Sequence, residues 1–200
     1  MIELITALAI VCSMVAPQAS KTLREMVREQ GPVNVYTQED FPPITLREVL
    51  AKVDVVFRGT VIGAEGSYVS EDGLDVLTEY SVDGSPVMVH DRVNGGPGED
   101  RPRAIIVVQR GGTTLIDGQQ VTVTHGGLEP LRPGTEAVFM LHRDGDTEKY
   151  RLVMDYFGVF TIDNGVVIPP RKGGMSRAYK GRTVDEFMSE LATAASIPHH

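Results

Sequence analysis

Short β-type runs separated by tight-turn dipeptides are the feature that most constrains the fold of this chain. Residues 53–62 alternate with a period of two and are rich in valine, which is typical of a strand with one buried face. Similar runs follow at residues 75–82, 87–93, 104–109, 120–124, 136–142, 149–155 and 159–162. Asp-Gly or Asn-Gly dipeptides stand at 72–73, 83–84, 117–118, 144–145 and 164–165. Because such dipeptides favour hairpin turns, the pattern predicts an antiparallel sandwich or barrel and excludes a doubly wound α/β sheet.

Short helices are expected outside this β region. Capping boxes of the type Thr-x-x-Glu begin at Thr22, Thr45 and Thr183, and each predicts the start of a helix. Residues 183–192 carry an apolar stripe at helical spacing, so we expect a C-terminal helix that docks on the β domain. Residues 33–43 are polar and contain proline, which we interpret as a linker.

The first twenty residues predict export. The apolar run at residues 4–15 is too short to span a bilayer, and its length suits a secretory signal peptide. An apolar helix packed on the domain, or an uncleaved anchor, is the alternative interpretation. Lipidation at Cys12 is a further alternative. We therefore expect a secreted or cell-envelope protein that touches a membrane only through this leader if the leader is retained.

Charge and residue types exclude several classes of function. Lys and Arg number 19 against 27 Asp and Glu, giving a formal charge of −8, so we expect no nucleic-acid partner. One cysteine cannot build a disulfide framework, and the histidine spacings match no zinc signature. The chain has neither a Walker-type phosphate loop nor a G-x-S-x-G nucleophile elbow. The sequence therefore predicts no metal, no cofactor and no catalytic residue.

Candidate binding residues come from the strands and from two histidines. Tyr68, Tyr80 and Val82, with the glycine-rich loop that follows, form the candidate surface for a ligand. His90 precedes an aspartate, and His125 precedes two glycines in a turn that a ligand could approach. Burial of the tyrosines in the core and solvation of the histidines are the alternative interpretations.

Several short segments between residues 45 and 167 follow one another in an order that is typical of one group of proteins. The segments are 50–61, 78–82, 111–113, 125–127, 131–141, 150–153 and 158–160. In this order they resemble a group of exported, mostly uncharacterised bacterial proteins. The domain of that group is similar to the OB-type barrel of tissue inhibitors of metalloproteinases and of netrin modules. The resemblance implies an OB-like barrel, to which the capping boxes and the terminal apolar stripe add a short N-terminal helix and a C-terminal docking helix.

The resemblance does not extend to protease inhibition. In the animal inhibitors an amino-terminal cysteine chelates the zinc of the protease, whereas the single cysteine here, Cys12, lies inside the apolar leader. We divide the chain into the leader at 1–20, a short helix and linker at 21–43, the barrel at 44–168, and a basic linker with the terminal helix at 169–200.

These observations favour an exported, non-enzymatic domain that binds a protein or an envelope polymer. A small hydrolase that uses His125 or His90 is the first alternative, and it requires a pocket in which titratable groups converge. A structural or assembly module that associates through an open barrel edge is the second alternative.

Overall fold

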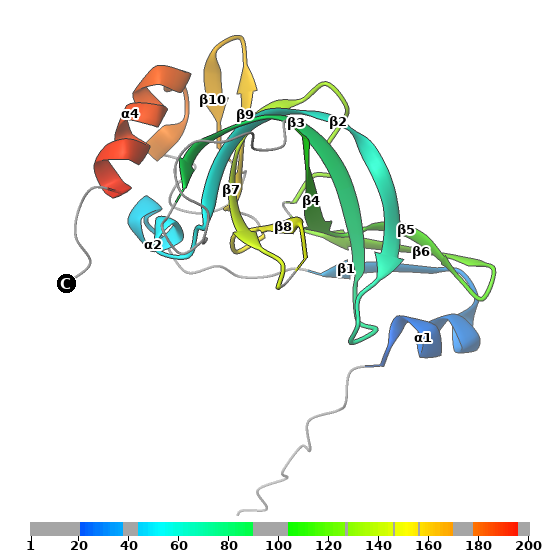
Figure 1. The fold of residues 1–200 in the computed structure, drawn as a ribbon. Helices are drawn as coiled ribbons and strands as arrows, with labels where there is room; N and C mark the ends of the chain where they lie inside the picture. The colour runs from blue at the N-terminus through cyan, green and yellow to red at the C-terminus, as the bar shows by residue number, and fades with distance from the viewer. Residues whose placement is uncertain are drawn as a thin grey trace, which may run out of the picture.

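The computed structural model describes residues 21–37, 44–89, 104–126, 128–145, 147–155, 157–169 and 178–195; the expected leader lies outside them. In chain order the elements are α1 (Leu23–Gln30), β1 (Val33–Thr37), α2 (Leu46–Leu50), β2 (Val55–Val69), β3 (Val76–Val89), β4 (Ala104–Arg110), β5 (Gly112–Ile116), β6 (Gln119–His125), β7 (Glu136–Arg143), β8 (Lys149–Leu152), β9 (Val159–Asp163), β10 (Val166–Ile168) and α4 (Val184–Ala195). The protein is mainly β, with short helices in the N-terminal region and at the C-terminus, as the sequence predicts (Figure 1).

Five strands form a ring. β7 pairs with β2, β2 with β3, and β3 with β4, all antiparallel; β4 then pairs with β8, which returns to β7. This order is that of a partly open OB-like barrel, so the predicted fold class is confirmed. Because β8 pairs over only three residues with each neighbour, the ring is barrel-like without being closed.

Two strand pairings depart from the antiparallel prediction. β4 and β8 are parallel within the ring, and β1 is parallel to β6 in a second, smaller sheet of order β1-β6-β5. The remaining pairings among the described strands are antiparallel. Parallel neighbours need a long connection, and no turn dipeptide marks them in a sequence.

The predicted turn at Asp83-Gly84 was wrong, because both residues lie inside β3 and pair with β2. Gly84 stands opposite Gly59, and a Cβ on Gly84 would lie 2.5 Å from the Gly59 Cα and closer still to the Arg58 carbonyl oxygen. Glycine is needed here because two backbones approach closely. The runs predicted at 75–82 and from residue 87 onward therefore belong to one strand.

β1 overturns the linker prediction for residues 33–37, whereas residues 38–43 lie outside the described residues. Val33 packs with Leu23 and Val27 of α1 in a core cluster between the helix and the small sheet. Sequence inspection did not predict β5 or β10. The turn dipeptides at 117–118 and 164–165 were nevertheless read correctly, since they join β5 to β6 and β9 to β10.

β2 and β3 extend beyond the ring as a long ribbon that curves toward the small sheet (Figure 1). The ribbon bends at three register shifts in the β2–β3 pairing. Its far part holds β5 through the Thr114 hydroxyl, which donates to the Ser67 carbonyl oxygen at 3.0 Å. The small sheet is therefore attached to the barrel by the same two strands that form much of the ring.

The helices begin at the predicted capping boxes: α2 and α4 pack together beside the barrel, whereas α1 packs on the small sheet (Figure 1). At α1, α2 and α4 the threonine side chain accepts from the backbone N–H of the glutamate three residues later, and that glutamate accepts from the threonine N–H. Phe187 of α4 stacks on Phe160 of β9, with ring centroids 4.6 Å apart, so the predicted docking of the terminal helix is confirmed.

Candidate functional site

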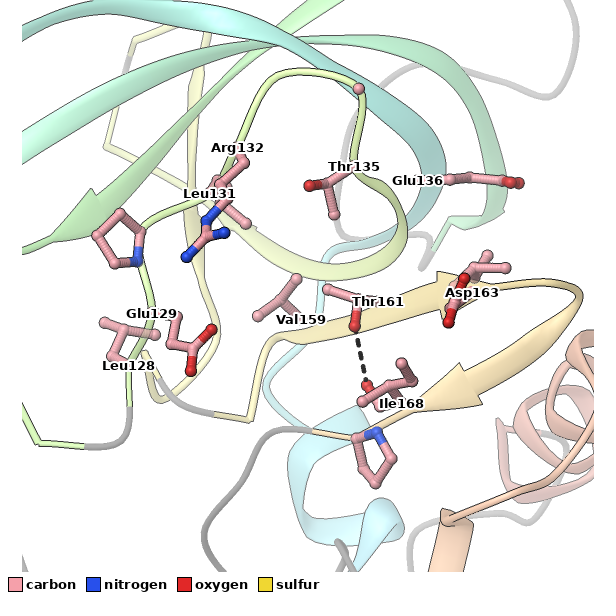
Figure 2. A pocket seen from close by; sticks show the side chains of 14 residues that line it. Leu128, Glu129, Leu131, Arg132, Thr135, Glu136, Val159, Thr161, Asp163 and Ile168 are labelled. Atoms are coloured by element: carbon pink, nitrogen blue, oxygen red, sulfur yellow. Dashed lines mark hydrogen bonds between the residues drawn. The ribbon is translucent and has the colours of Figure 1, made fainter.

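A groove lies between residues 128–136 and the β9–β10 hairpin, and its volume is about 590 Å³ (Figure 2). Its apolar side chains include Leu128, Leu131, Val159 and Ile168, and its charged side chains are Glu129, Arg132, Glu136 and Asp163. The first three apolar residues are buried, whereas Ile168 is 46% exposed. An apolar floor with a few polar groups at the rim is the usual composition of a ligand site.

One wall of the groove is fixed by Gln109, a buried residue of β4. Its side-chain Nε2 donates to the Glu129 carbonyl oxygen at 3.0 Å, and its Oε1 accepts from the Leu131 N–H at 3.2 Å. The Gly134 N–H donates to the Val61 carbonyl oxygen at 2.8 Å farther along the same wall. Because a buried amide is costly to leave unpaired, these bonds hold the wall in place before any ligand arrives.

The opposite wall is the β9–β10 hairpin, which α4 supports from behind. The Thr161 hydroxyl donates to the Ile168 carbonyl oxygen at 3.4 Å, the contact drawn as a dashed line in Figure 2. The Val167 N–H donates to the Arg182 carbonyl oxygen, and the Val184 N–H to the Gly165 carbonyl oxygen. Both walls of the groove are therefore tied to the rest of the fold.

The charges of the groove are only partly paired. Glu136 accepts from Arg58 at 2.7 Å, and both side chains are about half exposed, so this pair contributes little to stability. Within the described part of the chain, Arg132 has no ion-pair partner. Figure 2 shows Arg132 and Asp163 on opposite sides of the groove, and Glu129 lies on the same side as Arg132.

A second polar cluster lies where the small sheet meets the barrel, and His125 is its centre. His125 is the last residue of β6 and is 2% exposed, so its expected place in an accessible turn was wrong. Its Nε2 lies 3.0 Å from Asp75 Oδ1, and its Nδ1 lies 2.6 Å from the Thr37 hydroxyl oxygen. Because an ionised carboxylate only accepts, Nε2 carries the hydrogen and donates to Asp75, while Nδ1 and the Thr37 hydroxyl share a second hydrogen bond.

Arg110 completes this cluster at the end of β4. Its Nε donates to Asp75 Oδ2 at 2.6 Å, and its Nη1 donates to Asp155 at 3.3 Å. Burial raises the pKa of the Asp75 carboxyl, but the hydrogen bonds from His125 and Arg110 outweigh burial and hold that pKa below its usual range. The cluster therefore joins β1, β6 and β4 through one ionised carboxylate.

The lowered pKa of Asp75 predicts a specific acid sensitivity. A depressed carboxyl pKa contributes stability above the unfolded pKa of 3.8, and this contribution is lost as pH falls through the folded pKa. We expect the wild type to lose more free energy of unfolding than Asp75→Asn between about pH 6 and about pH 3, by urea denaturation. Parallel losses in the two proteins would show that Asp75 is not stabilised as its contacts imply.

The space beside His125 is small. A cavity of about 110 Å³ is lined by residues that include Tyr80, Gln109 and His125. It has room for a few water molecules but not for a ligand of ordinary size. Within the described residues, the contacts of His125 therefore connect β1 and β6 to Asp75 and Arg110.

The structure does not bring the five sequence-predicted binding residues together. Tyr80 and Val82 are buried in the barrel interior, and Tyr68 is 38% exposed on the ribbon. Burial, followed by its hydrogen bond with Glu79, raises the pKa of the Tyr68 hydroxyl. His90 and the loop through residue 103 lie outside the described residues. Of the four that the structure describes, Tyr80 and His125 line the same small cavity, and none lines the groove.

The groove itself was missed at the sequence level. Residues 131–141 were recognised as part of a resemblance, but nothing in their pattern marks Leu131 or Arg132 as facing a hollow. The usable signal was Gln109, a polar residue within the apolar run of β4, because a buried amide implies backbone partners.

Comparison with protein-family models, with curated proteins and with solved structures finds no match for this chain. Among the described residues, no helix is long and apolar enough to cross a membrane. In the same residues, no cluster of three or more His, Cys, Asp or Glu side chains is arranged to hold a metal ion. The fold and the groove are therefore the basis for a functional proposal.

Proposed function

We propose that the protein is an exported, non-enzymatic binding domain and that the groove holds a segment of a partner protein. The leader at residues 1–20 is the argument for export. The groove is the argument for binding, because it combines an apolar floor with a polar rim and rigid walls. Rigid walls favour binding, since a preformed site loses less conformational entropy when a ligand enters.

The composition of the groove suits a peptide segment. The floor residues Leu131, Val159 and Ile168 accept an apolar side chain, while Arg132 and Asp163 offer a charged contact on either side. An extended peptide presents apolar side chains together with polar backbone groups, which this arrangement can satisfy simultaneously.

The alternative of a hydrolase has one supporting observation. His125 lies between the hydroxyl of Thr37 and the carboxylate of Asp75, an order that resembles a nucleophile, base and orienting acid. However, the imidazole is almost completely buried, Asp75 is shared with Arg110, and the adjacent cavity holds only a few waters. These contacts favour a structural role for His125.

Selection from a displayed random peptide library tests the proposed groove. We expect enriched peptides to bind Thr161→Arg at least about tenfold more weakly than wild type, because the new side chain fills the groove. Thr193→Arg is the matched control, since Thr193 is exposed on α4 and does not line the groove. Binding is measured by titration with fluorescent peptides.

The peptide experiment has two outcomes that contradict the proposal. One is a library from which no peptide is enriched. The other is a set of peptides whose affinity is the same for wild type, Thr161→Arg and Thr193→Arg. Thermal unfolding of all three proteins establishes that the groove variant is folded when its binding is compared.

A further inference from the structure

The outer face of the small sheet is uncharged. The strands β1, β5 and β6 contain no Asp, Glu, Lys or Arg, although these residues make up 23% of the chain. Their inward residues pack under α1, and the alternation of the strands turns the others outward. The outward side chains are Asn34, Tyr36, Thr113, Leu115, Gln120, Thr122 and Thr124. We call this surface the neutral face.

The neutral face is arranged in rows across the sheet. Asn34 stands opposite Thr122, which in turn stands opposite Thr113, and the two threonine hydroxyl oxygens lie 3.0 Å apart. Tyr36 stands opposite Thr124, and Leu115 opposite Gln120. Hydroxyl and amide groups therefore alternate with one aromatic ring and one leucine, and three of the threonines, Thr113, Thr122 and Thr124, also line the small cavity beside His125.

Tyr36 is both exposed and held in place. The residue is 65% exposed, yet its ring rests against Gly126, where an added Cβ would lie 2.5 Å from the tyrosine hydroxyl oxygen. The Gly126 N–H also donates to the Thr37 carbonyl oxygen at 2.7 Å, and the Thr37 side chain is bonded to His125. The ring is therefore positioned by its backbone neighbours and by the His125 cluster below it.

The polar groups of this face are available to a ligand. Among the described residues, the side chains of Asn34, Gln120 and Thr124 have no hydrogen-bond partner. An amide or hydroxyl group both donates and accepts. A purely apolar partner would bury these groups unpaired, at a cost of about 1–3 kcal/mol for each group. A charged partner finds no complementary charge on the three strands.

We propose that the neutral face binds an uncharged polysaccharide, with the ring of Tyr36 as the stacking platform. A sugar ring has an apolar face of C–H groups and an edge of hydroxyl groups that donate and accept. The exposed ring of Tyr36 can stack on the C–H face of the sugar, and the amide and hydroxyl side chains can hydrogen-bond to its hydroxyl groups. This site is distinct from the peptide groove, because the two share no residue.

Affinity electrophoresis in native gels tests this proposal. The probes are four soluble neutral polysaccharides: dextran, a β-1,3-glucan, galactomannan and glycol chitin. We expect at least one of them to retard the wild type, and Tyr36→Ala to weaken that retardation at least about tenfold in apparent affinity. Tyr36→Trp keeps an aromatic platform and should retain retardation. Tyr68→Ala, at a second exposed tyrosine, should also retain it.

Gly126→Ala tests whether the position of the Tyr36 ring matters, because this variant keeps the tyrosine but moves its ring. The new methyl group displaces the tyrosine ring while leaving it on the surface, so we expect retardation to weaken although Tyr36 is intact. Thr161→Arg, which fills the peptide groove, should leave retardation unchanged. Loss of peptide binding and loss of polysaccharide binding are therefore distinguishable.

Three results would overturn the polysaccharide site. The first is the absence of retardation by all four probes, and the second is retardation that Tyr36→Ala leaves unchanged. The third is a wild-type dimer in sedimentation that Tyr36→Ala converts to a monomer, because the face would then be covered by a second copy. Thermal unfolding confirms that each variant is folded before its migration is interpreted.

Discussion

Replacement of Gly84 by alanine is expected to lower the free energy of unfolding by about 3 kcal/mol or more. The added Cβ would lie 2.5 Å from the Gly59 Cα and nearer still to the Arg58 carbonyl oxygen. Both contacts are with backbone atoms, which cannot rotate away as a side chain can. Relief requires β2 and β3 to separate, and these two strands form adjacent sides of the ring.

Urea denaturation of wild type and Gly84→Ala, followed by circular dichroism, measures this effect. Gly66→Ala is the matched control, because Gly66 lies on β2 and a Cβ there meets nothing within 4 Å. We expect the control to differ from wild type by less than about 1 kcal/mol. A Gly84→Ala protein as stable as this control would contradict the close approach of the two strands.

Replacement of Asp75 by alanine is expected to cost about 3 kcal/mol of stability. The carboxylate accepts from His125, from Arg110 and from the Val76 N–H, so its removal leaves three donors without their acceptor. His125 is almost fully buried and cannot turn to water for a replacement partner. β1 loses part of its attachment as well, because Thr37 is held by the same imidazole.

Chemical denaturation of Asp75→Ala beside Asp83→Ala measures the contribution of the buried carboxylate. Asp83 is exposed on β3, so its removal should change stability by less than about 0.5 kcal/mol. Arg110→Ala and the double variant complete a mutant cycle, in which we expect losses that are not additive. Additive losses would show that Asp75 and Arg110 are independent of each other.

The parts of the fold that were predicted from the sequence are those fixed by residues that lie close together along the chain. A capping box joins two residues three positions apart, and the helices begin at Thr22, Thr45 and Thr183 as expected. The turn at Asp117-Gly118 depends only on backbone conformation, with Asp117 at a φ of 51°. The dipeptide Asp83-Gly84 misled the analysis because glycine also serves where two strands approach closely.

The parts that were not predicted depend on distant partners. β1 was interpreted as part of a linker because residues 33–43 are polar and contain proline, and its partner β6 follows 88 positions later at the pair Thr37 and His125. Asp75 and His125 are 50 positions apart. Neither side chain carries a local signal of the other, since the contact forms only when the small sheet packs against the barrel. The groove likewise forms only when the hairpin and residues 128–136 face each other.

The parallel pairing of β1 with β6 has a consequence for the order in which the chain assembles. As the polypeptide is synthesised, β1 emerges well before the strand that must receive it, so it waits without a hydrogen-bonded neighbour. The small sheet can be completed only after β5 and β6 have folded back on one another. The tyrosine on the neutral face is therefore carried by a strand that is made early and gains its neighbour only after β6 has been made.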